Sequence, residues 1–183
     1  MATMTTLTVE DYKVLPETGP RYQLVEGKLR MAPAPNRYHQ RIASNIEFLI
    51  RGWIEFGGGK GLVYFAPFDV YLDNENVFQP DVLYFSPANF GVLTDAGCEG
   101  APDLVVEVLS SRTRAIDLGP KKKVYAASGV REMWIVDPEL RQLDVFRLAE
   151  SVETPVRSCG EDESLVSELF PDLELLGSKI FAE

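Results

Sequence analysis

The stretch that decides the fold is Asp103-Leu104-Val105-Val106-Glu107-Val108-Leu109. Its residues from 104 to 109 are apolar except for Glu107, and such a run is typical of a central strand that helices cover on both faces. An ionised carboxylate in a covered strand is costly unless it pairs with a cation. Glu107 is therefore interpreted either as one half of a structural ion pair with an arginine or as a metal ligand.

Helices and strands extend on both sides of this stretch. Their order predicts an α/β or α+β fold, in which helices pack on a β-sheet and a β-hairpin lies near the N-terminus. The 183 residues fit one domain, with a core over about residues 20–148 and an acidic C-terminal extension over 149–183 that could be a strand, a helix or a partner arm. The predicted elements are helices at 7–15, 37–56 and 118–128, a hairpin at 22–25 and 28–31, and strands at 61–72, 81–85, 103–109, 132–136 and 142–148.

The charge of the chain is unevenly distributed. The formal net charge is −10, which by itself argues against a nucleic-acid partner. Residues 150–183 account for most of it, with nine acidic and two basic residues. The segment from Arg112 to Arg131 instead carries six basic residues and one acidic residue. We therefore expect a nearly neutral body with one basic segment and an acidic tail.

A second acid, Asp81, occupies a place similar to that of Glu107. Pro80-Asp81 opens the apolar run Val82-Leu83-Tyr84-Phe85, and alternation along a strand puts Asp81 on the side of Leu83 and Phe85. An aspartate after a proline is often only a turn or strand-start residue. Two acids on neighbouring strands could instead bind Mg²⁺, which prefers carboxylate oxygens together with waters and phosphate.

Three consecutive lysines lie on the predicted helix at 118–128. At about 100° per residue, Lys121 falls within the apolar arc of this helix, Lys122 at its border and Lys123 on the opposite side. We expect Lys121 to emerge toward the sheet with a partner for its ammonium group, and the other two lysines to be solvated. Asp117 is the expected N-cap. The arc is formed by Leu118, Val124 and Tyr125.

Residues for metal or redox chemistry are few. Cys98 and Cys159 are isolated, which excludes a zinc ribbon or a disulfide framework. The single histidine, His39, cannot supply a multi-histidine site, and it stands on the apolar face near the start of the helix at 37–56 as either a core residue or a neighbour of the site. No export signal and no membrane-length apolar run is seen, so we expect a cytoplasmic protein without a membrane partner.

Several short motifs together resemble a known family. They are Glu26-Gly27, His39-Gln40, Gln79-Pro80-Asp81, Pro102–Ser110, Asp117-x-x-x-Lys121 and Gly129–Asp137. Over about residues 7–148 the chain resembles the Uma-two family of predicted endonucleases, in the restriction-endonuclease-like, PD-(D/E)xK superfamily. The resemblance implies a restriction-endonuclease-like core with a central mixed sheet flanked by helices. It also implies that Asp81 and Glu107 are the metal-binding acids, with Glu26 as an accessory acid.

One position departs from the superfamily pattern. The superfamily places its lysine two residues after the second acid, where this chain has Leu109. The family resemblance and the helical arc both indicate Lys121 instead, supplied by the following helix. The catalytic residues are then expected to be Asp81, Glu107 and Lys121, with His39 and Glu26 as accessory residues.

Two functions of different classes remain open. The first is a metal-dependent endonuclease that uses Mg²⁺ or Mn²⁺ to hydrolyse DNA phosphodiester bonds; a hydrolase of smaller phosphate esters would share the same site. The alternative is a non-catalytic module that binds nucleic acid or protein and retains the nuclease fold, which the displaced lysine and the acidic balance favour. DNA is the expected partner, and a homodimer is a further possibility. The expected phosphate contacts are Arg112, Arg114, Lys122 and Lys123.

Overall fold

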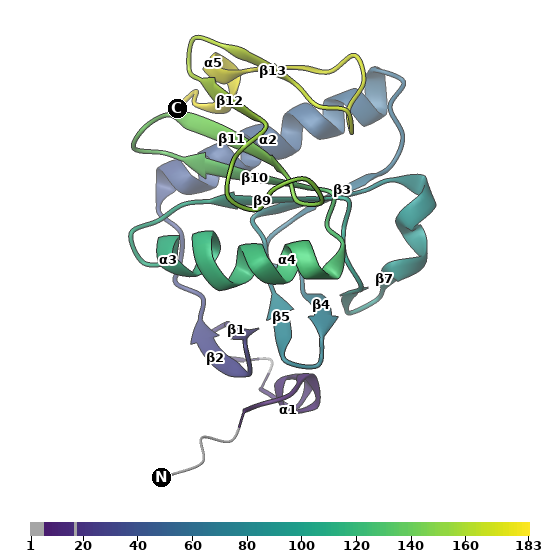
Figure 1. Cartoon of the computed structure of the whole chain (residues 1–183), viewed down its shortest axis with the longest axis vertical. Helices are drawn as coiled ribbons and strands as arrows, with labels where there is room; N and C mark the ends of the chain where they lie inside the picture. The colour runs from purple at the N-terminus through teal and green to yellow at the C-terminus, as the bar shows by residue number, and fades with distance from the viewer. Residues whose placement is uncertain (1–5, 17) are drawn as a thin grey trace.

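The large sheet of the molecule is built around the strand that contains Glu107. The computed structural model of the chain describes residues 6–16 and 18–183 (Figure 1). The spatial order of the strands is β12 (Arg157–Gly160), β11 (Gln142–Arg147), β10 (Glu132–Asp137), β9 (Leu104–Val108), β6 (Val82–Phe85) and β3 (Leu62–Phe65). β9 pairs parallel to β10 and antiparallel to β6. The predicted mixed sheet is therefore confirmed, with β9 in its interior.

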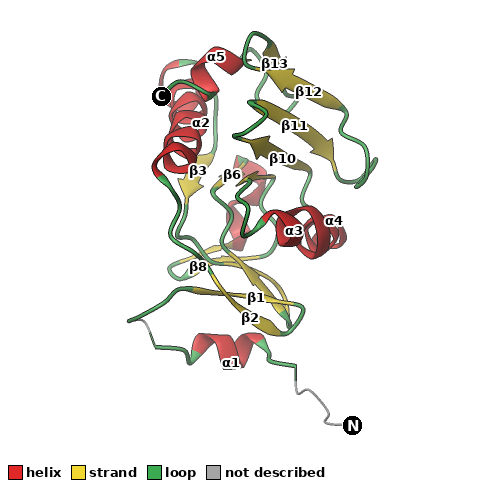
Figure 2. Ribbon diagram, turned by 90° about the vertical axis from the view of Figure 1, so that its left-hand side faces the viewer, coloured by secondary structure: helices red, strands yellow, loops and turns green. Residues whose placement is uncertain are grey.

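Different helices cover the two faces of this sheet, and they lie on opposite sides of it in Figure 2. On one face, α2 (Arg37–Phe56) contributes Ile46 to the apolar cluster that contains Val106. On the other face, α4 (Lys122–Ser128) contributes Tyr125 to the cluster that contains Val105. Because side chains alternate along a strand, Glu107 points to the α4 side of the sheet.

A second sheet lies beneath the large one and holds the N-terminal hairpin (Figures 1 and 2). Glu26 and Gly27 form the hairpin turn, with φ angles of 49° and 68°, the left-handed values that a two-residue hairpin turn requires. The helix α1 (Val9–Lys13) packs against this sheet through Val9. The strand order is β2 (Lys28–Met31), β1 (Tyr22–Val25), β5 (Asn76–Phe78), β4 (Val70–Asp73), β8 (Gly97–Glu99) and β7 (Leu93–Thr94).

Two segments differ from the predicted elements in this region. The predicted strand at 61–72 is two strands, because the chain leaves the large sheet after β3 and enters the second sheet as β4. The predicted loop after β6 contains the 3₁₀ helix η1 (Pro87–Val92) and the short pair β7–β8. These strands have two or three residues each, too few for alternation to be visible in the sequence.

The helical run that precedes β10 begins earlier than predicted. It consists of α3 (Arg114–Ile116), a π-helical turn η2 (Asp117–Lys121) and α4. Asp117 is not the N-cap that was predicted, because it lies within the helical run and its side chain is buried. The wide π turn also rotates Leu118 outward, to 41% exposure, although the regular helical arc placed it against the sheet. Single π turns inside helices are frequent at functional sites.

The C-terminal extension is part of the core rather than a free arm. The pair β13 (Ser164–Val166) and β14 (Glu174–Leu176), followed by α5 (Gly177–Ile180), leads the chain back to α2 (Figure 1). Phe170 and Phe181 are buried in the same cluster as the apolar face of α2. The Trp53 Nε1 of α2 donates a hydrogen bond of 2.9 Å to the carbonyl of Pro171. Within the described residues, no helix is both long and apolar enough to cross a lipid bilayer.

Candidate active site

Asp81 stands directly before β6 and reaches across to β9. Its backbone N–H donates to the Val106 carbonyl at 3.0 Å, and its carboxylate Oδ2 accepts a 2.7 Å hydrogen bond from the Val108 N–H. Asp81 thus binds the backbone of β9 on either side of Glu107, through its own N–H at Val106 and through its carboxylate at Val108. The two predicted acids therefore come from adjacent strands.

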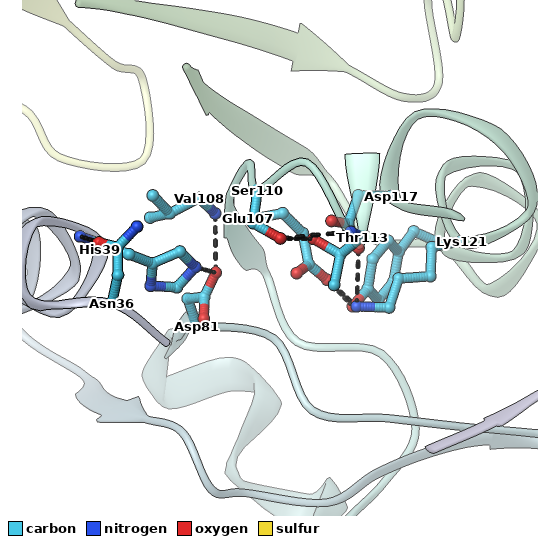
Figure 3. Close-up of polar contacts among 10 residues, drawn as sticks. Asn36, His39, Asp81, Glu107, Val108, Ser110, Thr113, Asp117 and Lys121 are labelled. Atoms are coloured by element: carbon cyan, nitrogen blue, oxygen red, sulfur yellow. Dashed lines mark hydrogen bonds and ion pairs between the residues drawn. The ribbon is translucent and has the colours of Figure 1, made fainter. Parts of the chain in front are cut away.

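Glu107 is the buried acid of the site, with 3% exposure. Its Oε1 accepts hydrogen bonds from Lys121 Nζ at 2.9 Å and from the Tyr125 hydroxyl at 2.7 Å (Figure 3). Burial raises the pKa of Glu107 to about 8; the Lys121 charge opposes this shift, while the charges of Asp117 and Asp81 add to it. The carboxylate is held in a fixed position by two donors, but its negative charge is only partly compensated.

Lys121 lies where the helical arc predicted it, with its ammonium directed at Glu107. It is 2% exposed, and Nζ also lies 3.1 Å from Asp117 Oδ1. Burial alone would lower the pKa of Lys121, but the charges of Glu107 and Asp117 outweigh it and raise this pKa. Lys121 is therefore a permanent cation between two buried carboxylates.

Asp117 is the residue of the site that the sequence reasoning missed. It was assigned to helix capping, whereas its carboxylate is buried and faces Lys121. A signal was present, because Asp117, Lys121 and Tyr125 are spaced four residues apart and such residues share one side of a helix.

Lys122 is buried, although the sequence predicts that it lies in solvent. It is 7% exposed, and its Nζ stands 3.3 Å from the centre of the Phe146 ring. This desolvation lowers the pKa of Lys122. The prediction that Lys122 is solvated is therefore wrong, whereas Lys123 is exposed as predicted.

His39 borders the site from the first turn of α2. The side chain of Asn36 caps this helix by accepting a 2.8 Å hydrogen bond from the His39 N–H. The imidazole Nε2 lies 3.3 Å from Asp81 Oδ2 (Figure 3). Burial lowers the pKa of His39, but the hydrogen bond to Asp81 and its charge outweigh this and raise it. His39 was predicted to be either a core residue or a neighbour of the site, and the structure places it beside the site.

These groups share one cavity of about 740 Å³ between the two sheets. Asp81, His39, Glu107, Asp117 and Lys121 all line it, and so does Arg112 on the loop after β9. Four predicted residues do not line it, namely Glu26, Arg114, Lys122 and Lys123. Glu26 is exposed at the hairpin turn, and Arg114 is engaged by Asp137 at 2.6 Å.

Three acidic side chains meet around one lysine in the cavity. Asp81, Glu107 and Asp117 contribute three carboxylates against the single ammonium of Lys121. Across residues 6–16 and 18–183, no three or more His, Cys, Asp or Glu side chains are grouped to bind a metal ion. Mg²⁺ does not require such a cage, because it is commonly bound by one or two carboxylates, waters and substrate phosphate. The pair Asp81 and Glu107 fits that manner of binding.

Comparisons with known proteins show the fold and the family of the chain. The chain is similar to a solved structure from Anabaena variabilis, titled a "putative nuclease belonging to DUF820", with 19% sequence identity, 96% of this chain and 98% of the other covered, and a TM-score of 0.79. This likeness shows a shared fold. No protein among the curated sequences matches the chain. Residues 9–177 match the model of a family described as "Putative restriction endonuclease". The chain thus belongs to the Uma2 family, the one that its motifs resemble.

Proposed function

We propose that this protein is a metal-dependent endonuclease that hydrolyses phosphodiester bonds in DNA. The observation that carries the proposal is the meeting of Asp81, Glu107 and Lys121 on the floor of one cavity, although 40 residues of chain separate the first from the last. Two acids and a lysine are the groups that phosphodiester hydrolysis needs for a divalent cation and for the charge that develops on phosphate. Membership of the Uma2 family supports the same chemistry.

In this proposal Asp81 and Glu107 hold Mg²⁺ or Mn²⁺. A cation bound there would polarise the phosphate and lower the pKa of a water molecule. Each acid has one oxygen engaged in the hydrogen bonds described above, Oδ2 of Asp81 and Oε1 of Glu107. The His39 imidazole and the Val108 N–H orient the first carboxylate, and Lys121 and Tyr125 orient the second. Lys121 also supplies positive charge beside the phosphate.

One observation favours the alternative of a binding module without turnover. The ammonium of Lys121 is held by both Glu107 and Asp117, so these residues could form a purely structural buried ion cluster. In that case replacing Glu107, Asp117 or Lys121 would change the free energy of unfolding, and the protein would have no cleavage activity to lose.

The test is cleavage of supercoiled plasmid DNA by the purified full chain with Mg²⁺, with Mn²⁺ or with EDTA. We expect metal-dependent nicking by the wild type and a loss of at least 100-fold in Asp81→Asn and Lys121→Ala. Lys179→Ala is the matched control, since this exposed lysine has the same charge and does not line the cavity. No cleavage by the wild type in either metal, with wild-type DNA binding in Asp81→Asn, would support the binding module.

A further inference from the structure

A second cavity, of about 240 Å³, adjoins the active-site cavity. The two share part of their lining, including Lys121, Asp117 and Arg112. The second cavity extends from there between the N-terminal hairpin and the start of the helical run at 114–128, where Arg30 and Ile116 line it. A ligand that places one group beside Lys121 can therefore place the adjacent group in this second space.

Several arginines that form no ion pair with a described carboxylate lie around the two cavities. The chain has eleven arginines, and six of them form ion pairs with carboxylates in the part of the chain that the structure describes. Three others, Arg21, Arg30 and Arg112, line the cavities, are exposed, and pair with no described carboxylate. Guanidinium groups bind phosphate through two parallel hydrogen bonds. Their common location indicates a ligand with more than one phosphate.

Part of the wall of the second cavity is apolar. Val25 on β1, Met31 on β2 and Ile116 in the last turn of α3 line it. Such a wall suits the flat face of a nucleobase, which is hydrophobic although its edge is polar. Phosphate-binding arginines at the rim and an apolar wall within are the features of a nucleotide site.

We infer that this second cavity binds the base of an unpaired nucleotide next to the scissile phosphate, so that the substrate is single-stranded or locally splayed DNA rather than an intact duplex. The inference rests on the proposed function and specifies its substrate. A base within a duplex is stacked and paired, and it must leave the helix before it can enter a cavity between the hairpin and the helical run. Glu107 and Lys121 are nearly inaccessible from the surface, so a phosphate that reaches them brings its neighbouring nucleotides between the hairpin and the helical run.

The test compares the affinity of the full-length protein, in EDTA and low salt, for a fluorescent 15-nucleotide single strand and for a blunt hairpin duplex. We expect tighter binding of the single strand by at least tenfold. Arg30→Ala, which removes the rim guanidinium, and Ile116→Trp, which fills the cavity, should each weaken single-strand binding at least tenfold. Arg157→Ala and Leu140→Trp are the matched controls, because both side chains are exposed and line neither cavity. They should stay within twofold of the wild type, and circular dichroism establishes that all variants are folded.

The outcomes separate this inference from the proposed function. Equal or tighter binding of the hairpin, or wild-type affinity in both cavity variants, would overturn the nucleotide site even if plasmid DNA is cleaved. Single-strand binding that depends on Arg30 and Ile116 would support the site, also in a protein that cleaves no DNA with Mg²⁺ or Mn²⁺. Such binding without cleavage would refute the proposed hydrolysis but not the nucleotide site.

Discussion

Replacement of Glu107 by glutamine tests whether the buried acid is kept for chemistry or for stability. The amide has nearly the same shape, and its oxygen can still accept hydrogen bonds from Lys121 and Tyr125. The change replaces an acid whose ionised form is disfavoured by burial and by the charges of Asp117 and Asp81. We therefore expect Glu107→Gln to abolish cleavage and to make the metal-free protein more stable.

The expected gain depends on pH. The pKa of Glu107 rises from an ordinary value of 4.5 to about 8, so between these values the folded protein retains a proton that the unfolded chain releases. The free energy of unfolding of the wild type therefore falls as pH rises through this window. At about 1.4 kcal/mol per pH unit, the upper limit of the gain from Glu107→Gln is about 3 kcal/mol at pH 7 and about 1 kcal/mol at pH 5. The new amide N–H groups need acceptors, which reduces the gain at pH 7 to about 1–2 kcal/mol.

The measurement is urea unfolding of both proteins in EDTA at pH 5, 6, 7 and 8. Glu55→Gln is the control, because it makes the same chemical change at an exposed residue of α2. The difference between Glu107→Gln and the wild type should grow with pH, and that of the control should stay flat. A loss of about 3–5 kcal/mol in Glu107→Gln at pH 7 would refute the reasoning, since a broken structural ion pair has that cost.

Three further outcomes are expected. Lys122→Ala should lower the free energy of unfolding by about 1–2 kcal/mol because its side chain covers Phe146, whereas Lys123→Ala should change it by less than about 0.5 kcal/mol in the same urea experiment. Truncation after Glu150 removes Phe170 and the rest of the C-terminal core, so circular dichroism should show an unfolded chain. The logarithm of the affinity for single-stranded DNA should fall with the logarithm of salt concentration with a slope of about −2, from about −0.7 for each of three arginine contacts; affinity independent of salt would contradict those contacts.

Much of the site was predictable because its signals are local. Glu107 interrupts the apolar run of β9, and a buried carboxylate needs a cation or hydrogen-bond donor beside it wherever the strand lies in the fold. The long helix α2 has a regular apolar face and a glycine end, and these set its boundaries within its own sequence. Lys121 could be distinguished from its two neighbours by direction alone, since each successive residue turns by about 100°.

The errors arose where the structure depends on distant parts of the chain or on irregular backbone. The π turn at Asp117–Lys121 widens one turn of the helix, so the regular arc put Leu118 on the wrong side and took Asp117 for a cap. Lys122 is buried because Phe146 of β11 lies beneath it, a contact that no local pattern encodes. Glu26 was carried over from the family resemblance alone, and the hairpin turn holds it outside the cavity.

The return of the C-terminal extension to α2 has a consequence for the order in which the protein folds during its synthesis. The apolar face of α2 is complete once residue 56 has been made, but Phe170 and Phe181, which share its cluster, come more than a hundred residues later. Contacts so distant in sequence form slowly and late. Until they form, the face of α2 stays partly open to water and to other chains. The core around α2 therefore closes only after Phe170 and Phe181 have been made.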